Sequence, residues 1–439
     1  MKKNLLLMIV LILAMSFLCV SCSGKDSTSI KPSGGYENAP ALSDGYVPNH
    51  VRSEMGDVGP TSSEGSSVEK STDGKTDSGT QRQDPPAGLI TACAWDDNIS
   101  YGDWNAMFAK GDDNTRAGKF SQFADNAWKL NTLNRVKVTV KNGENFVCGA
   151  TVSFFGADQK EYKGVTNANG VAYIFLEEQE GTLTVKSGEG EGTAAFTAEN
   201  RDLTVDLTNN ANKDNVIKIM FVVDVTGSMG DELNYLTNEI TDVIGRIARN
   251  DDQTRIDLAL LFYRDNGDNE KFSYAEFKNV TDATLLAEQK QALAAQSATG
   301  GGDIPEALDE AVLMAVSKDW GEENSTKIIF HVFDAPSHEK EENITRCGQA
   351  VKIAAEKGIR YCPVLCSGAD LLCEYIARQG ALYTAGTFIY VTDHSGIGNE
   401  HYDPSIPNAV VEKLNDMMVR LVIGYHTGTF ADPVWWNAK

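Results

Sequence analysis

The sequence has 439 residues, more than one ordinary domain needs, and this length suggests two or three domains. Hydrophobic residues make up 41% of the chain, which is enough to form buried cores. The formal net charge of −23 argues against a nucleic-acid partner, because no basic surface is available to displace the counterions of phosphates. An acidic excess also keeps an exported protein soluble.

The N-terminus has the form of an export signal. Lys2-Lys3 precedes an apolar run from residue 5 to 18, which is too short to span a bilayer comfortably and fits a cleaved signal. The run ends in Cys19-Val20-Ser21-Cys22, which resembles the cleavage box of bacterial lipoproteins. The resemblance implies that residues 1–22 form a signal peptide with a lipidation site, so that an acyl chain on Cys22 holds the protein to a membrane. Cys19 replaces the usual Leu, which leaves plain secretion as the alternative.

The next two segments differ in composition. Residues 23–86 are rich in Ser, Gly, Asp, Pro and Thr, and they cannot bury enough apolar surface to offset the entropy of ordering. We therefore predict a disordered tether there. Residues 87–132 contain many aromatic side chains, including Trp95, Trp104 and Trp128, and we predict short helices that pack on the following domain.

Residues 133–210 show the two-residue period of half-buried strands. Val136, Val138 and Val140 alternate with polar residues, and Asn142-Gly143 is a turn signal. Short strands at this spacing predict a small antiparallel β-sandwich. The stretches 148–152 and 164–172 resemble carboxypeptidase regulatory-like modules, which have no active site of their own. That resemblance implies a spacer or a docking module.

Strands and helices alternate over residues 214–425, and a C-terminal tail follows over 426–439. The run 216–223 is continuously apolar, as expected for a strand buried on both faces of a sheet. Strands separated by helices, with right-handed crossovers, predict an open doubly wound α/β sheet of Rossmann-like type. Further strands are predicted at 255–263, 327–333, 359–365 and 387–391, and helices after Met229 and at 284–296, 304–316, 341–357 and 407–422.

Polar residues stand where the predicted strands end, and ligands of such sheets gather at that edge. Asp224-Val225-Thr226-Gly227-Ser228 follows the first strand, Thr299 lies in a glycine-rich loop before a helix, and Asp334 follows a later strand. In this order the three pieces resemble the metal-ion-dependent adhesion site of von Willebrand factor type A (VWA) domains. Thr226 replaces the first Ser of the D-x-S-x-S signature and keeps a hydroxyl there. The resemblance spans residues 214–425.

The resemblance implies a divalent cation that is held by oxygen atoms. Mg²⁺ suits such a site because it prefers hard oxygen ligands in octahedral geometry, and Mn²⁺ or Ca²⁺ are alternatives. Three hydroxyl ligands leave the cation electrophilic, so that it can accept a carboxylate from a partner. The implied ligands are Asp224, Thr226, Ser228, Thr299 and Asp334, and the candidates for the surrounding rim are Asp265, Asp303, His338, Asp393 and His394.

The cysteines and histidines support weaker hypotheses. An exported compartment permits disulfides, but the spacing of the cysteines beyond Cys22 determines no pairing. Cys362, Cys366 and Cys373 lack the paired C-x₂-C knuckle of zinc sites, so buried thiols or disulfides are favoured. His331 is expected in the core. A hydrolase built on the histidines would need a nucleophile elbow, and the sequence contains no G-x-S-x-G in a strand–turn–helix setting.

We therefore predict a binding or adhesion protein without enzymatic activity. A lipid at Cys22 would anchor it in the cell envelope, with the outer membrane favoured and with either the periplasm or the outside as its surroundings. A cation would then hold an Asp or Glu carboxylate of a partner protein. Two alternatives remain open, an assembly scaffold with a structural ion and a hydrolase.

Overall fold

The computed structural model of the chain describes residues 86–436, apart from 110–116, 125–127, 129, 251–252, 303, 323, 398–400, 402–403, 405 and 408. The predicted signal peptide, Cys22, the tether up to residue 85 and the rim candidate Asp303 lie outside the described residues. In the part of the chain that is described, no helix combines the length and the apolar character that crossing a bilayer requires.

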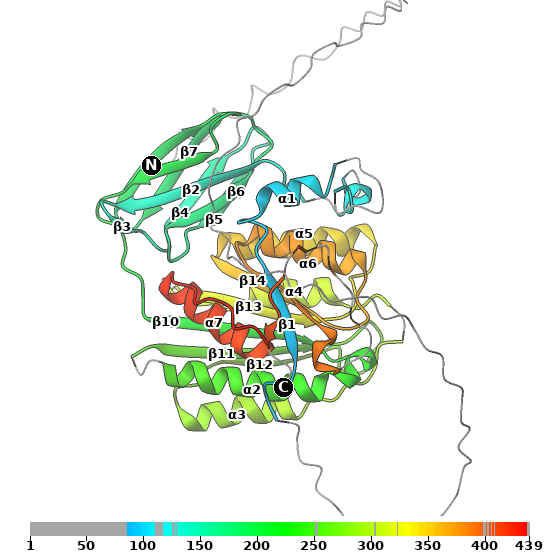
Figure 1. Cartoon of the computed structure of the whole chain (residues 1–439). Coiled ribbons are helices and arrows are strands. Elements are labelled where there is room, and N and C mark those ends of the chain that lie inside the picture. The colour runs from blue at the N-terminus through cyan, green and yellow to red at the C-terminus, as the bar shows by residue number, and fades with distance from the viewer. Residues whose placement is uncertain are drawn as a thin grey trace, which may run out of the picture. The chain divides into compact units, whose positions relative to one another are not determined.

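A mixed sheet forms the centre of the α/β region, with the strand order β12-β11-β10-β13-β14-β15-β1-β16 among the described residues (Figure 1). The central strands from β11 to β15 are parallel, so their carboxyl ends meet at one edge. Strands β12 and β1 pair antiparallel with their neighbours β11 and β15. The strands are β1 (Thr91–Trp95), β10 (Val216–Asp224), β11 (Arg255–Tyr263), β12 (Phe272–Asn279), β13 (Thr326–Phe333), β14 (Ile359–Leu365), β15 (Phe388–Val391) and β16 (Glu412–Lys413).

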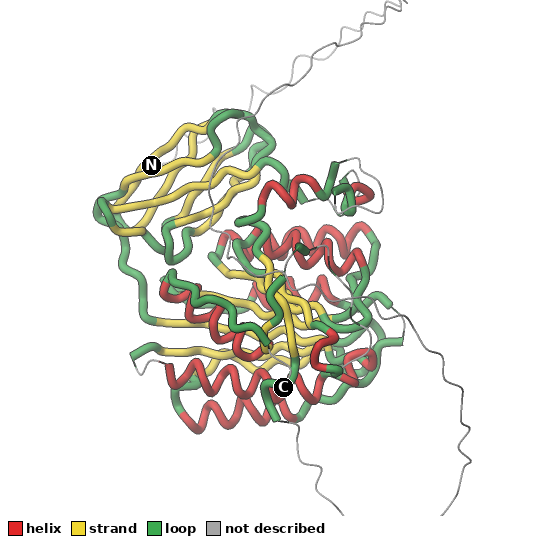
Figure 2. The backbone as a smooth tube through the Cα atoms, viewed as in Figure 1, coloured by secondary structure: helices red, strands yellow, loops and turns green. Residues whose placement is uncertain are grey.

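Helices cover both faces of this sheet, as Figure 2 shows. Every residue of β10 is buried, and successive side chains alternate between the faces. Ile219 and Phe221 pack in the core beside α2 and α7, whereas Met220 and Val222 pack in the core beside α4, α5 and α6. This architecture confirms the predicted doubly wound sheet. The helices are α2 (Leu233–Asn250), α3 (Ala283–Ala294), α4 (Leu308–Ser317), α5 (Glu341–Glu356), α6 (Leu371–Tyr383) and α7 (Leu414–Thr427).

Two small sheets form a β-sandwich between β1 and β10 in the chain. One has the order β3-β2-β6 with β9 beside β2, and the other has the order β5-β4-β7-β8. The alternating Val136, Val138 and Val140 are all buried in the core between the sheets. The pairing is antiparallel except for β9, which runs parallel to β2 and departs from the prediction. The strands are β2 (Arg135–Asn142), β3 (Asn145–Phe146), β4 (Thr151–Phe155), β5 (Glu161–Val165), β6 (Val171–Phe175), β7 (Gly181–Ser187), β8 (Gly190–Phe196) and β9 (Asp202–Asp206).

The aromatic-rich segment contributes a strand as well as helical turns. The sequence predicts short helices over 87–132, and one of them is α1 (Tyr101–Ala106), but Thr91–Trp95 forms β1 instead. This strand pairs with β15 over four residues. Its start is fastened by Glu239 of α2, whose carboxylate accepts the backbone N–H groups of residues 88, 89 and 90 at 2.8–3.0 Å. Residues 87–132 are therefore part of the α/β domain.

The position of β1 shows where the sandwich lies in the chain relative to the large sheet. The chain first passes through the α/β sheet as β1, then forms β2 to β9, and returns to the same sheet as β10. The sandwich is thus an insertion into the α/β domain. The N-terminal segment therefore joins the sheet directly through β1, and the sandwich does not separate it from the α/β sheet.

A buried ion cluster ties the aromatic-rich segment to α6. Arg378 of α6 donates to both oxygens of Asp97, at 2.6 and 2.9 Å, and to Glu374 at 2.8 Å. All three side chains are almost completely buried. Beside them, the ring of Phe123 stacks on Tyr375 of the same helix with 4.3 Å between the centroids. The buried guanidinium thus offsets part of the negative charge of the two carboxylates, and burying such charges without a partner would be costly.

Candidate cation site at the carboxyl edge of the sheet

The first part of the site is the turn that follows β10. Asp224 Oδ1 accepts hydrogen bonds from the backbone N–H of Thr226 at 2.9 Å and from its hydroxyl at 2.7 Å. The hydroxyl oxygens of Thr226 and Ser228 lie 3.2 Å apart. Asp224 and Thr226 are buried, whereas Ser228 is exposed. The structure therefore brings three predicted ligands together in a row that leads from the core to the surface.

The glycine-rich loop joins this turn through its backbone. Thr299 N–H donates to the carbonyl of Val225 at 3.0 Å, and Gly227 N–H donates to the carbonyl of Gly300 at 3.1 Å. Gly301 has a φ of 72°, a region that residues with a Cβ rarely adopt. A Cβ at this glycine would lie 2.9 Å from Glu306 Oε1. The glycine-rich loop approaches its neighbours so closely that it needs a residue without a Cβ at Gly301. Its backbone contacts place the exposed Thr299 beside the Asp224 turn.

The third part is Asp334, which follows β13 directly beside β10. Burial, and next the negative charge of Asp334, raise the pKa of Asp224 to about 7. Asp224 Oδ2 is buried and accepts no hydrogen bond from the described residues. A nearby negative charge disfavours the ionised form of a carboxyl group, as happens when two carboxyl groups share one cation site. Asp334 is thus close enough to Asp224 for their charges to interact.

Glu306 is a carboxylate of this site that the sequence did not single out. Its backbone N–H donates to the carbonyl of Pro336 at 3.0 Å, which holds it against the loop after β13. Burial raises its pKa to about 8, with Asp224 as the next contribution, and Oε2 is buried without a hydrogen-bond partner among the described residues. Glu306 stands just before a helix, where an acidic residue is usually explained by its favourable interaction with the helix dipole. The sequence alone therefore gives no indication that Glu306 belongs to the site.

The donor set fits a hard cation. Among the described residues, no group of three or more His, Cys, Asp and Glu side chains is arranged to hold a metal ion. A cation at this edge would therefore rely on the hydroxyls of Thr226, Ser228 and Thr299 together with carboxylates. Oxygen atoms of this kind are the ligands that Mg²⁺ prefers. A positive ion would also stabilise the charged form of Asp224.

The loop after β11 holds the Thr299 loop from the side. The buried guanidinium of Arg264 donates to the carbonyls of Thr299 at 3.0 Å and Ser297 at 3.2 Å. Asp268 accepts the N–H of Gly301 at 2.9 Å and the N–H of Asp265 at 3.1 Å. These contacts fix the backbone of the glycine-rich loop. Arg264 and Asp268 were not among the predicted site residues, although the sequence places them at the end of a predicted strand.

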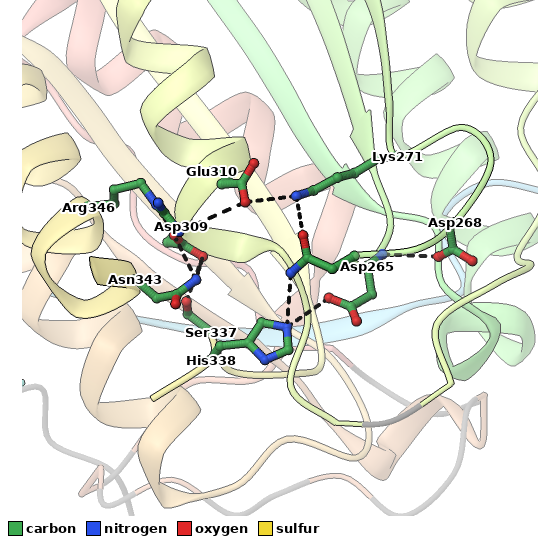
Figure 3. A network of polar contacts seen from close by, with 10 residues as sticks. Asp265, Asp268, Lys271, Asp309, Glu310, Ser337, His338, Asn343 and Arg346 are labelled. Carbon is green, nitrogen blue, oxygen red and sulfur yellow. Dashed lines mark hydrogen bonds and ion pairs between the residues drawn. The ribbon is translucent and has the colours of Figure 1, made fainter. Parts of the chain in front are cut away.

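A polar network continues from this loop to the segment after β13 (Figure 3). His338 Nε2 lies 2.9 Å from Asp265 Oδ1, so these two predicted rim residues do contact each other. Lys271 forms an ion pair with Glu310 of α4 at 2.8 Å. The neighbouring Asp309 is fully buried and accepts hydrogen bonds from Ser337, Asn343 and Arg346. The network connects the ends of β11 and β13, which flank the candidate site.

The other two rim candidates lie in a different cluster, after β15. His394 contacts the ring of Trp436 and the hydroxyl of Thr392. Asp393 Oδ1 lies 2.7 Å from His401 Nδ1, and His401 Nε2 lies 2.7 Å from Glu232 Oε1. Glu232 directly precedes α2 and is buried. His401 therefore bridges the rim loop and the segment that follows the Asp224 turn.

The bridge predicts a pH-dependent stability. Burial lowers the pKa of His401, but hydrogen bonds to Glu232 and Asp393 outweigh it, so the net pKa is raised. A raised folded-state pKa stabilises the fold below the unfolded value of about 6.5, and this contribution disappears as the pH rises through the folded pKa. We expect His401→Ala to lower the free energy of unfolding by about 1.5–3 kcal/mol in acid, as for a charge-assisted hydrogen bond. The loss should shrink at alkaline pH.

Denaturant unfolding of the two proteins over a range of pH values measures this difference. His394→Ala, which removes an exposed histidine of the same loop, is the matched control and should cost less. A difference between wild type and His401→Ala that is constant with pH would show that His401 contributes packing alone.

The remaining histidine and the cysteines lie where the sequence favoured them. His331 is fully buried between the hydroxyls of Tyr263 and Tyr361, at 3.0 and 2.6 Å, and burial lowers its pKa to about 3. No disulfide joins the cysteines within the described residues, so the thiol alternative holds there. They are Cys93, Cys148, Cys347, Cys362, Cys366 and Cys373.

No curated protein shows a significant match to the chain. Among solved structures, the conserved hypothetical protein BatB from Bacteroides thetaiotaomicron is 15% identical, with a TM-score of 0.31 over 42% of this chain and 91% of that one. The pilus adhesin SpaC from Lactobacillus rhamnosus GG, in its open conformation, is 12% identical, with a TM-score of 0.34 over 63% of this chain and 36% of the adhesin.

A third structure, a von Willebrand factor type A protein from Catenulispora acidiphila, is 14% identical, with a TM-score of 0.30 over 56% of this chain and 46% of that chain. The family model described as von Willebrand factor A domain matches residues 218–356. This stretch contains the Asp224 turn, the glycine-rich loop and Asp334. Residues 218–356 therefore form a von Willebrand factor A domain.

Proposed function

We propose that the carboxyl edge of the α/β sheet binds Mg²⁺, with Mn²⁺ or Ca²⁺ as alternatives. The residues that would hold the cation are the five implied by the sequence, and Glu306 adds a further carboxyl group beside them. The observation that carries this proposal is the buried oxygen Asp224 Oδ2, which lacks a hydrogen-bond partner among the described residues while its carboxyl group faces other acids. Such an arrangement is costly unless a positive charge compensates it.

The cation would serve to hold a carboxylate of a protein partner. Ser228 and Thr299 are exposed residues, so a cation held beside them would be open to solvent on this side. When bound, the cation supplies an electrophilic centre for an Asp or Glu side chain. The chain's own residues orient it: Asp224 fixes the hydroxyl of Thr226, and Arg264 and Asp268 fix the Thr299 loop. This is a binding function without a chemical step.

The N-terminal sequence supports a place in the cell envelope. An acyl chain on Cys22, followed by a polar tether, would keep the folded part near a membrane while it stays in water. The outer membrane is the favoured location. The inserted β-sandwich, with its resemblance to regulatory-like modules, would then be a docking module.

A scaffold with a structural ion is the second candidate function. The crowding of Asp224, Glu306 and Asp334 supports it, because a cation that only relieves this repulsion would still order the edge. The two functions differ in whether the cation contacts the partner. A hydrolase is less favoured, because His331 is buried between two tyrosines and His338 and His401 contact carboxylates.

Binding of acidic peptides separates these functions. We expect the chain without its signal peptide to bind an array of peptides with a single Glu in Mg²⁺, and to lose this binding in EDTA or when Gln replaces Glu. Thr299→Ala should bind much more weakly, because one hydroxyl ligand is lost. Binding that persists in EDTA, or a folded Thr299→Ala protein that binds as the wild type does, would contradict capture through the cation and favour the scaffold.

A further inference from the structure

A cleft of about 780 Å³ lies between the β-sandwich and the edge of the α/β sheet that is opposite to the candidate cation site. Its α/β side includes Thr326 at the start of β13 and Arg360 near the start of β14. Its sandwich side includes Thr166 and Lys186. The two strands run parallel, so the cleft lies at their amino ends, whereas Asp334 follows the carboxyl end of β13. The volume of the cleft is typical of sites for small molecules.

Hydrogen bonds hold the two sides of the cleft together. Asn324 Nδ2, just before β13, donates to the carbonyl of Cys148 in the sandwich at 3.1 Å. Arg360 Nη2 donates to the carbonyl of Val165 in β5 at 3.1 Å. Gly149 allows the close approach, because a Cβ at this residue would clash with the side chain of Asn324. The shape of the cleft is therefore set by specific contacts between the sandwich and the α/β sheet.

The cleft is basic in a protein that is acidic as a whole. Among the described residues that line it, five are basic and three are acidic, whereas the chain has a formal net charge of −23. Lys318 is half-buried and places its ammonium group over the ring of Tyr274, 4.1 Å from the centroid. Lys357 is exposed and donates to the carbonyl of Val316 at 2.7 Å. Neither lysine forms an ion pair within the described part of the chain. The basic residues are Lys186, Lys318, Lys327, Lys357 and Arg360, and the acidic ones are Asp319, Glu322 and Glu356.

The charge of Arg360 is buried without an opposite charge beside it. The residue is 8% exposed, and it donates to the carbonyls of Thr384 at 3.0 Å and Val165 at 3.1 Å. No carboxylate of the described residues forms an ion pair with this guanidinium. Burial lowers the pKa of Arg360, because a low-dielectric environment disfavours the charged form. An anion in the cleft would supply an opposite charge, and a buried charge is costly without one.

The hydroxyl of Ser325 is a second polar group of the lining that points to a ligand. Its oxygen is buried and has no hydrogen-bond partner among the described residues. A hydroxyl can donate to an oxyanion. A guanidinium has five N–H groups, and the two carbonyls that Arg360 contacts accept only two hydrogen bonds from it. Both side chains therefore have donors for the oxygen atoms of an anion.

We propose that the cleft binds a small, soluble phosphate monoester, whose phosphate group accepts hydrogen bonds from Arg360 and lies close to Lys318 and Lys357. A phosphate monoester carries about −1.5 to −2 charges at neutral pH, which matches the excess of basic over acidic residues in the lining. A guanidinium suits phosphate, because its planar N–H groups can bind two oxygen atoms at once. The rest of the cleft accommodates the polar organic part of the ligand.

A membrane surface is the less favoured source of this phosphate group. The net charge of −23 repels the chain as a whole from an anionic surface, whereas a small ligand responds to the local charge of the cleft. The inference goes beyond the proposed function, because the cleft lies at the other edge of the sheet and requires no metal. It stands even if capture of a carboxylate by a cation fails.

Calorimetric titrations of the chain without its signal peptide test the inference. They are run in EDTA with inorganic phosphate, glucose 6-phosphate and glucose. We expect glucose 6-phosphate to bind more tightly than inorganic phosphate, and glucose to show no binding. The affinity for glucose 6-phosphate should rise as the pH is raised through about 6, because the phosphate group then gains its second negative charge while the basic residues stay charged. Added salt should weaken the binding.

Variants of the basic residues assign the binding to the cleft. Arg360→Gln should lower the affinity for glucose 6-phosphate about tenfold or more, as expected for the loss of a charged hydrogen bond. The double variant Lys318→Gln, Lys357→Gln should lower it to a similar extent. This double variant keeps the contacts of Arg360 with the sandwich, so it guards against misfolding of Arg360→Gln. The matched control is Lys340→Gln, Lys413→Gln, which removes two exposed charges outside the cleft and should bind as the wild type does.

Four outcomes would overturn the inference. The first is that neither inorganic phosphate nor glucose 6-phosphate binds to the wild type. The second is that the control weakens binding as much as the cleft variants do, because the anion would then respond only to net charge. The third is binding that requires Mg²⁺, which would place the anion at the opposite edge. The fourth is binding to phosphatidylcholine vesicles that contain phosphatidic acid without binding to either soluble phosphate, which would identify a lipid headgroup as the ligand.

Discussion

Asp224→Asn is expected to abolish the stabilisation of the protein by Mg²⁺. In the wild type, Mg²⁺ at a hundredfold excess over its dissociation constant should raise the free energy of unfolding by about 2.7 kcal/mol, because only the folded state binds it. For a domain of this size, that corresponds to a rise in Tm of about 5–10 °C. Asn keeps the shape of Asp224 but removes its charge, so the cation loses a partner in the buried part of the site. Thermal unfolding with Mg²⁺ and with EDTA measures the response.

The same variant should behave in the opposite way without metal. Burial and the charge of Asp334 raise the pKa of Asp224 to about 7, so its ionisation opposes folding when no cation is present. In EDTA at alkaline pH, Asp224→Asn should therefore be at least as stable as the wild type. Glu339→Gln, at an exposed position of the same edge, is the control and should keep the full Mg²⁺ response. An unchanged Mg²⁺ response in Asp224→Asn would refute the site.

Arg378→Ala is expected to have the largest effect on stability. Removal of the guanidinium leaves the buried carboxylates of Asp97 and Glu374 without the cation that compensates them. Breaking a buried ion pair in this way typically costs about 3–5 kcal/mol. The Tm should fall by about 6–20 °C. Because Asp97 belongs to the aromatic-rich segment, the loss should also loosen the contact of that segment with α6. Hydrogen exchange of β1 measures this second effect.

A triple variant provides the matched control for Arg378. Asp97→Asn, Glu374→Gln and Arg378→Met together remove every charge of the cluster and keep similar side-chain volumes. Because the triple variant leaves no uncompensated charge buried, it should be more stable than Arg378→Ala. A triple variant as unstable as the single one would show that packing, rather than uncompensated charge, accounts for the loss.

The regular parts of the α/β domain could be predicted because their residues follow simple patterns. The strands at 255–263 and 359–365 have the bounds expected from their apolar runs. Helix α6 escaped prediction because most of its residues are buried, so no polar stripe marks its period. Strand β12 is a half-buried edge strand without clear alternation. The helix predicted at 304–316 begins only at Leu308, since Glu306 pairs with Ser337 instead.

The candidate site shows a similar division. The order of Asp224, Thr299 and Asp334 along the chain, each at a strand end, is enough to predict that they meet at one edge. Glu306 could not be predicted because its orientation depends on a contact with the loop after β13. The bridge from Glu232 through His401 to Asp393 joins distant segments, since Glu232 and His401 are 169 residues apart in the sequence. Such contacts depend on tertiary packing, which a local pattern does not encode.

The place of β1 in the sheet also decides how the protein would respond to mechanical load. A pull on the N-terminal segment would enter the fold at β1, where Glu239 holds the backbone of residues 88–90. The strain would then pass through the β1–β15 ladder into the sheet whose edge carries Asp224, and the inserted sandwich would remain unloaded. An attachment through the N-terminal segment and the candidate binding edge would thus be connected through one sheet.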